Sequence, residues 1–348
     1  MLDTRHRSEG APVNLTGSIT KVALFMLASA ACWLVFNQFE IASPEGFDAV
    51  RFEYFARYGL PEAFADSSSY RMVLLLEAVY QYLPYYWGYV FFVGILLVVL
   101  VCCDSQKITK FAMYSPISFY YLGQTGKDGI AILSLLAIAT VTTGKLNAGK
   151  IIFVGFMICL AYYVRPAILL FIPIAAIQFR LGTAYAVYLS AGLAILFTII
   201  SDFYQITSIL AAAVTSYETG EETAILRQFT FGYELQNVVL RIGLLSISVI
   251  FQPILGFVKS YNSGELYLIF DAFCISAFVC LLIRDKLLFK FMISSIPYVL
   301  AIGYASPYYH FRYLAIAYPA IWVYSYYASN LGVARKNSAY YSLNNSKF

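Results

Sequence analysis

Long apolar runs follow one another along this chain, and they limit its possible folds more than any other feature. Hydrophobic residues make up 61% of the 348 residues and charged residues only 12%, whereas a soluble domain carries about 25% charged residues. One soluble core cannot hide so much apolar surface from water, so we expect the lipid bilayer to act as its solvent. The sequence therefore predicts an all-α, polytopic membrane protein that forms a single membrane domain over residues 1–348.

The apolar runs predict about ten transmembrane helices. A helix needs about 20 residues to cross the hydrocarbon core, or fewer where the protein thins the bilayer. The predicted helices lie at residues 21–37, 85–103, 111–123, 129–143, 151–164, 167–180, 184–200, 266–283, 288–305 and 313–330. A break is expected at Arg165-Pro166, because proline disfavours the helical conformation in the residue before it.

Lysines and arginines predict the orientation, because cytoplasmic segments carry more of them. With the N-terminus inside, 14 of the 23 Lys and Arg residues lie in inner segments. This requires that residues 238–258 do not cross the membrane fully, so we interpret them as a re-entrant or interfacial element. Whether they cross is left open. Both termini then lie inside.

Two long outer regions follow from this topology, at residues 38–86 and 201–265. The first is predicted to contain two short helices. From Phe47 to Tyr58, apolar side chains recur at helical spacing, so we expect an amphipathic helix. The residues of its expected apolar face are Phe47, Val50, Tyr54 and Tyr58.

The stretch from Gln124 to Gly129 places charged residues between two apolar runs. Ionisable groups at such a depth usually face a polar cavity and often mark a functional path. In the predicted topology several ionisable residues share the outer face with this stretch. These residues are Asp48, Lys127, Asp128, Arg165, Arg227, Arg241, His310 and Arg312.

This set of side chains suits chemistry on a phosphorylated substrate. Guanidinium groups present paired donors to phosphate, and a carboxylate or imidazole can take a proton from an attacking hydroxyl. Each residue also has a purely structural interpretation. Asp48 can pair with Arg51, the Lys127–Asp128 pair can cap a helix, and Arg165 can extend to the lipid headgroups. The cysteines lack the spacing of metal ligands, so we expect no metal and no cofactor, and no basic stripe indicates nucleic acid.

Two short motifs resemble a known family. Gly126-Lys127-Asp128 before an apolar span, with Arg165-Pro166 after the next, resembles the layout of bacterial O-antigen and capsule repeat-unit polymerases of the Wzy type. Ile250-Phe251-Gln252-Pro253, followed by a span with Asp271, is similar to an outer motif of some members. The chain departs from the family pattern where Gln252 replaces an arginine and Ala167 replaces a histidine. The first outer loop, with an acidic residue and two short helices, also resembles glycosyltransferases of the GT-C type.

The resemblance implies a glycosyltransferase of the bacterial inner membrane whose site faces the periplasm. It would join oligosaccharide repeat units carried on undecaprenyl pyrophosphate, for lipopolysaccharide or capsule biosynthesis. The implied partners are this lipid-linked substrate, membrane lipid and a chain-length regulator protein. The cations Lys127, Arg165, Arg241 and Arg312 would bind the pyrophosphate, and the implied catalytic residues are Asp48, Asp128 and His310.

Two alternatives remain open at this stage. One is a GT-C glycosyltransferase that uses a sugar donor carried on polyprenyl phosphate. The other is a flippase or transporter of lipid-linked oligosaccharides, which is not an enzyme. A transporter usually places charges near the membrane midplane on broken helices, often with internal repeats, whereas here the charges gather at one face.

Overall fold

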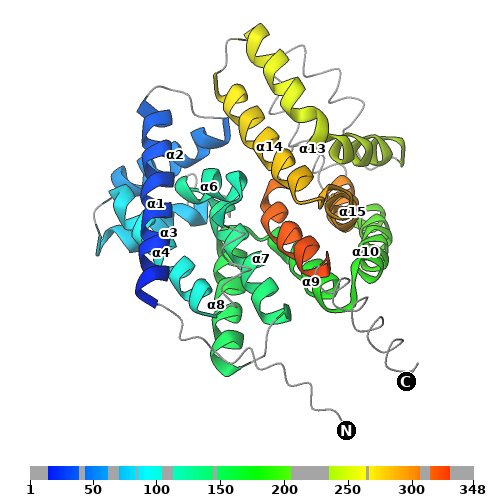
Figure 1. Ribbon diagram of the computed structural model, residues 1–348, viewed down its shortest axis with the longest axis horizontal. Helices are drawn as coiled ribbons and strands as arrows, with labels where there is room; N and C mark the ends of the chain where they lie inside the picture. Colours follow the sequence, from blue (N-terminus) through cyan, green and yellow to red (C-terminus); the bar gives the residue numbers. More distant parts are fainter. Residues whose placement is uncertain are drawn as a thin grey trace, which may run out of the picture.

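The computed structural model describes residues 15–38, 44–61, 70–83, 85–103, 113–143, 147–204, 235–263, 266–305 and 314–329. Within these ranges all regular elements are helices (Figure 1), which confirms the predicted all-α class. His310 and Arg312 lie outside the described residues, as do residues 205–234 of the second predicted outer region.

The helix boundaries follow the apolar runs closely. The N-terminal half contains α1 (Leu15–Gln38), α2 (Pro44–Tyr58), α3 (Arg71–Tyr80), α4 (Tyr85–Cys103), α6 (Pro116–Gly123), α7 (Lys127–Thr143) and α8 (Ala148–Val164). The C-terminal half contains α9 (Ile168–Leu181), α10 (Thr183–Tyr204), α13 (Leu235–Ser263), α14 (Leu266–Arg284), α15 (Leu288–Ala305) and a helix at residues 314–329.

Two helices in the described part of the chain are long and apolar enough to cross a membrane, judged by length and composition. They are Thr16–Val35 of α1, with 20 residues, and Tyr85–Cys103 of α4, with 19 residues. Other apolar stretches, such as Ala148–Val164 and Ile168–Leu181, are shorter.

The predicted helix at residues 111–123 is shorter than expected in its described part. There α6 has only eight residues, which at 1.5 Å per residue extend about 12 Å, whereas the hydrocarbon core is about 30 Å thick. Pro116 occupies the first turn of α6, and Gln124 at its end has an extended backbone. Proline at the start and the extended residue at the end limit α6 to two turns.

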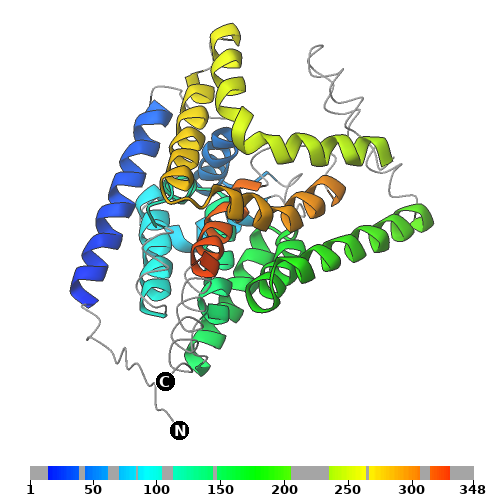
Figure 2. The ribbon, with the colours of Figure 1, turned by 45° about the vertical axis from the view of Figure 1, so that its right-hand side comes forward.

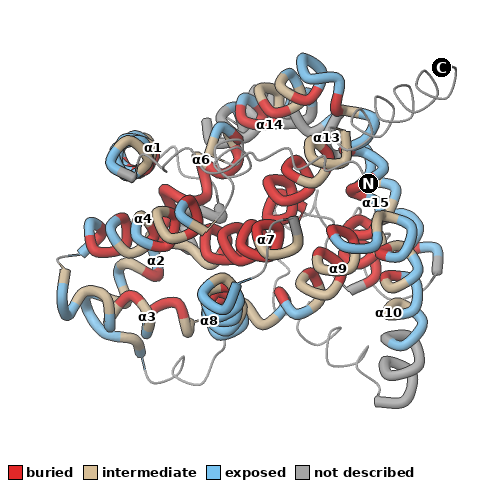
Figure 3. The backbone as a smooth tube through the Cα atoms, turned by 60° about the horizontal axis from the view of Figure 1, so that its bottom comes forward, coloured by how far each residue is buried: buried red, intermediate tan, exposed pale blue. Residues whose placement is uncertain are grey.

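The central helix of the N-terminal half is α7, which is buried from Asp128 to Thr140 (Figure 3). It packs against α4, α6, α8 and α9. A helix that is apolar all round requires such complete coverage, and the small side chains of Ala131 and Ala137 let neighbouring helices approach closely.

A glycine fixes the crossing of α1 and α6. A Cβ atom added at Gly123 would lie 2.5 Å from the carbonyl oxygen of Ser29 on α1. Any larger residue would therefore push the two helices apart, which ties the position of the α6 C-terminus to α1.

Residues 238–258 form part of one long helix. The 29 residues of α13 contain a bend, visible in Figure 2, and the helix packs against α14 and α15. Pro253 lies within its range, and a proline in a helix interior removes a hydrogen bond and kinks the helix.

The predicted orientation can be tested with single cysteines on a background without the six native ones. Arg51 on α2 and Asp285 after α14 are both exposed, so cysteine at either position is reactive when the reagent reaches it. We expect an impermeant maleimide added outside the cell to label Arg51→Cys and to leave Asp285→Cys unlabelled until the membrane is broken. The reverse pattern would contradict the predicted topology.

Candidate functional site

The structure brings together three of the predicted site residues. Lys127 and Asp128 begin α7, and Arg165 follows α8. Asp48 lies in α2, but its side chain is outside the described part of the structure. These positions meet where α2 packs near the start of α7.

An ion pair joins Arg165 to Asp128. The two side chains are only 13% and 5% exposed, respectively. Asp128 lies in the first turn of α7, where the helix dipole favours a carboxylate. Arg165 ends α8 with φ −147° and ψ 82°, because Pro166 disfavours a helical conformation before it. The Arg165-Pro166 pair thus ends α8 at a point from which the Arg165 guanidinium reaches the start of α7.

Lys127 lies over an aromatic ring of α2. Its Nζ is 5.2 Å from the ring centroid of Phe52 on α2. Such a cation–π contact contributes about 0.5–2 kcal/mol, depending on burial. Phe52 is itself buried and packs edge-on against Tyr70 before α3, so the ammonium group is held against the α2–α3 pair.

The turn at Gln124–Gly126, between α6 and α7, is fixed from two sides. The Thr125 hydroxyl donates to the Ala49 carbonyl of α2 at 3.1 Å. The Tyr86 hydroxyl of α4 donates to the Gly123 carbonyl at 2.6 Å. Because Thr125 and Tyr86 are both buried, these bonds hold the turn in one position beneath α2.

The buried face of α2 differs from the predicted one. Ala49 and Phe52 are buried, whereas Tyr54 and Tyr58 are 57% and 73% exposed. The expected apolar face was wrong at Tyr54 and Tyr58, where it followed the large aromatic residues, whereas Val50 is partly buried and packs against the core as expected. The small side chain of Ala49 allows α2 to approach the turn closely enough for the Thr125 hydrogen bond.

Glu53 is a carboxylate that the sequence analysis missed. It forms an ion pair with Arg57 one turn later, and its side chain is 13% exposed. Burial raises the pKa of the Glu53 carboxyl, while Arg57 and Thr125 lower it in part. The Arg57 guanidinium also lies 4.8 Å from the ring centroid of Tyr85. The i, i+4 spacing of Glu53 and Arg57 was visible in the sequence, but such pairs on an exposed helix face are common.

Arg241 does not lie on an accessible surface. It is completely buried, and its Nε donates to the Gly303 carbonyl at 2.7 Å. Gly303 lies in the last turn of α15, where backbone carbonyls lack partners within the helix. A cation there also complements the helix dipole. This contact assigns Arg241 to the packing of α13 on α15, and its predicted role in binding pyrophosphate gains no support.

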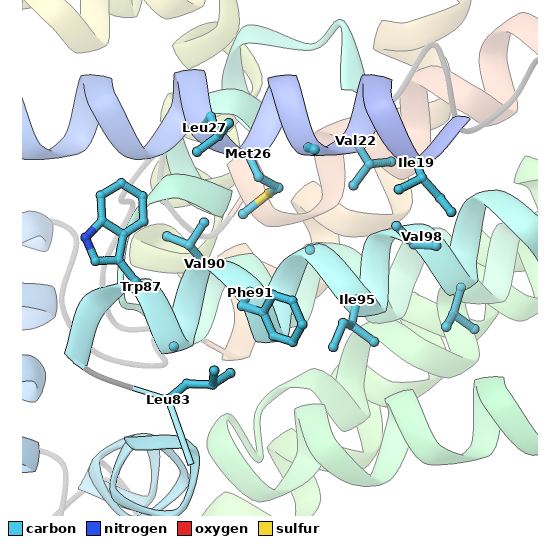
Figure 4. A pocket seen from close by; sticks show the side chains of 14 residues that line it. Ile19, Val22, Met26, Leu27, Leu83, Trp87, Val90, Phe91, Ile95 and Val98 are labelled. Atoms are coloured by element: carbon cyan, nitrogen blue, oxygen red, sulfur yellow. The ribbon is translucent and has the colours of Figure 1, made fainter. Parts of the chain in front are cut away.

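An apolar groove runs between α1 and α4 (Figure 4). It has a volume of about 590 Å³. It extends from Leu83 and Trp87 near the start of α4 to Ile19 and Val98 further along the two helices. The lining side chains are hydrocarbon apart from the Met26 sulfur and the Trp87 indole, so the groove suits an apolar chain.

Comparisons with protein-family models, with curated proteins and with solved structures find no match. Among the described residues, no group of three or more His, Cys, Asp and Glu side chains could hold a metal ion.

Removing one partner of the Asp128–Arg165 pair should destabilise the protein. Breaking a buried ion pair costs on the order of 3–5 kcal/mol, because the remaining charge stays buried. We expect Asp128→Asn to lower both the amount of folded protein and its thermal unfolding temperature in detergent. The matched control is Asp285→Asn at an exposed position, which should resemble the wild type.

A double variant separates pairing from other effects. If the pair is the cause, Asp128→Asn combined with Arg165→Gln should lose less stability than the sum of the two single changes. Strictly additive losses would show that the two side chains act independently.

Proposed function

We propose that this chain is a polytopic membrane glycosyltransferase that acts on lipid-linked oligosaccharides at the periplasmic face of the bacterial inner membrane. More specifically, we propose a repeat-unit polymerase. The observation that carries the proposal is the meeting of Lys127 with the Asp128–Arg165 ion pair beneath α2. The same residues carry the resemblance in the sequence.

The helix ends around the ion pair support the proposal that these residues lie on the same side of the membrane. The site lies at the N-terminal ends of α4 and α7 and at the C-terminal end of α8, and α1 leads into α2. The Arg71 guanidinium of α3 also lies 5.7 Å from the ring centroid of Tyr163, near the end of α8. This arrangement agrees with the predicted outer face and favours an interfacial site over a transport path at the midplane.

In the proposed reaction, a hydroxyl oxygen of one lipid-linked unit attacks the anomeric carbon of the growing chain. A new glycosidic C–O bond forms, and the C–O bond to undecaprenyl pyrophosphate breaks. The pyrophosphate leaves with the electron pair of that bond, and the hydroxyl proton passes to a base. Asp48, Asp128 and His310 are the proposed candidates for the base.

Lys127 and Arg165 would stabilise the charge that develops on the leaving pyrophosphate. A guanidinium has five N–H donors, so Arg165 can keep a bond to Asp128 while it donates to phosphate. Asp128 would then fix the orientation of Arg165 before the substrate arrives. Arg312 is proposed to add a further positive charge.

The groove between α1 and α4 is proposed to hold part of the polyprenyl chain. Its lining is apolar, and it begins beside Trp87, one residue after Tyr86, which bonds to the site turn. A lipid chain in the groove would therefore lead toward the pyrophosphate.

The GT-C alternative keeps one specific point in its favour. α2 and α3 pack together and lie against the charged site, as the resemblance to the first outer loop of GT-C enzymes implies. Such an enzyme would transfer one sugar from a polyprenyl phosphate donor.

Deletion of the gene distinguishes these functions. A polymerase predicts surface polysaccharide shortened to single repeat units on a gel, whereas a single-sugar transferase predicts a missing branch sugar at normal length. Unchanged surface polysaccharide would contradict both.

Arg165→Lys should keep the positive charge and lose most of the activity. Lysine is a point charge and cannot present the paired donors of guanidinium. A hydrogen bond to a charged group is worth about 1.5–3 kcal/mol, so we expect polymer synthesis to fall about 10- to 100-fold at a normal protein level. Arg284→Lys, at an exposed position at the C-terminal end of α14, is the control. Full activity of Arg165→Lys would show that the paired donors of Arg165 are not needed for the reaction.

Gly94→Phe should obstruct the groove without disturbing the helix contacts. A Cβ at Gly94 would meet only the Met26 side chain, at 3.8 Å. We expect the KM for the lipid-linked donor to rise several-fold. Gly155→Phe is the control, because a Cβ there meets nothing within 4 Å and Gly155 does not line the groove. Equal KM values for both variants would show that the chain lies elsewhere.

A further inference from the structure

A second cavity lies between α1, α2 and α4, on the side of α2 that carries Glu53. Its volume is about 320 Å³, within the range of about 300–1,000 Å³ common for small-ligand sites. Unlike the apolar groove, it combines aromatic and polar side chains. The residues that matter here are Trp33, Asn37, Glu53, Arg57, Tyr58 and Tyr86.

The polar side chains of the cavity are held in place. The Glu53 carboxylate is paired with Arg57, and Arg57 also stacks on Tyr85. A carboxylate accepts hydrogen bonds through two oxygens, and a guanidinium donates in a fixed fork. With the amide of Asn37 they provide both donors and acceptors for neighbouring hydroxyl groups.

The aromatic side chains supply flat apolar faces. Trp33 and Tyr86 are buried at the cavity. Tyr54 and Tyr58 of α2 place their rings 4.8 Å apart and remain largely exposed. Sugar rings have C–H faces that pack on aromatic rings and hydroxyl edges that need polar partners. Both kinds of partner are present in this cavity.

The cavity adjoins the charged site through two shared elements. Tyr86 lines the cavity and donates to the Gly123 carbonyl before the site turn. Glu53 follows Phe52, whose ring lies under Lys127. Phe52 and Glu53 point about 100° apart around α2, so a sugar in the cavity would lie on the face of α2 next to the one that covers Lys127.

A neighbouring cavity of about 420 Å³ lies on the other side of Arg57, against α3. Glu77, Tyr80 and Gln81 line it. Two cavities that share Arg57 fit successive sugar rings better than one isolated sugar.

We propose that the Glu53–Arg57 cavity is a carbohydrate subsite that holds a sugar ring of an oligosaccharide between the aromatic faces of α1, α2 and α4. Glu53 accepts hydrogen bonds from sugar hydroxyls, and Tyr58 covers the ring. The proposal that the protein binds a carbohydrate rests on this cavity alone. The role of that sugar as the acceptor end rests on the proposed function.

The test uses purified full-length protein in lipid nanodiscs on an array of bacterial surface oligosaccharides. Wild type should bind a subset of the glycans. Tyr58→Ala and Glu53→Gln should each reduce that binding at least about tenfold, the effect of 1.4 kcal/mol. Tyr188→Ala is the matched control, because Tyr188 is 74% exposed and Tyr58 is 73% exposed, and it should bind as wild type does.

Two results would overturn the subsite. One is a wild-type protein that binds no glycan on the array. The other is equal binding by wild type, Tyr58→Ala and Glu53→Gln, which would show that the tyrosines serve only as interfacial anchors.

The glycan-binding test is independent of the gene-deletion test of the proposed function. Glycan binding that depends on Tyr58, together with unchanged polysaccharide after gene deletion, would keep the subsite and reject the polymerase. Lost polymer after deletion, with no dependence on Tyr58 or Glu53, would keep the polymerase and reject the subsite.

Discussion

The buried ion pair between Asp128 and Arg165 is the interaction on which the arrangement of the N-terminal half depends. Taking a carboxylate and a guanidinium out of water costs several kcal/mol per ion, and pairing compensates only when the geometry is good. The start of α7 and the end of α8 must therefore stay together. Since α7 is buried from Asp128 to Thr140, its N-terminus fixes the turn against which α2 packs.

The surroundings of this pair explain why the charges can lie so deep. Phe52 covers Lys127, and the Thr125 and Tyr86 hydroxyls satisfy backbone carbonyls of α2 and α6. Hydrogen bonds of this kind limit the cost of burying polar groups. α2 thus covers the charged residues, and it also carries the Glu53–Arg57 cavity on another face.

Much of the helix order could be predicted from the sequence, because apolar runs and proline breaks are local signals. The predicted helix at 288–305 agrees with α15, and Arg165-Pro166 ends α8 as expected. The helix at 111–123 was predicted too long because apolarity does not show where Pro116 begins a two-turn helix.

The site could be predicted only in part. The charge pattern predicts that Lys127, Asp128 and Arg165 lie on one side of the membrane, and the three residues do meet in the structure. Arg241 is buried because it bonds to Gly303, and Glu53 lines the cavity between α1, α2 and α4. Both positions depend on tertiary contacts. The buried face of α2 was missed in part because the small Ala49 side chain was not counted in the apolar face, which followed larger residues such as Tyr54 and Tyr58.

Direct measurement of pyrophosphate binding tests the central claim that Lys127 and Arg165 form an anion site. Purified protein in nanodiscs can be titrated with undecaprenyl pyrophosphate while its phosphorus NMR signals are followed. The account predicts shifted signals with wild type and at least about tenfold weaker binding with Lys127→Met. The same loss is expected with the charge-neutral double variant Asp128→Ala, Arg165→Ala, which leaves no buried charge unpaired. Equal affinity of the three folded proteins would contradict the account.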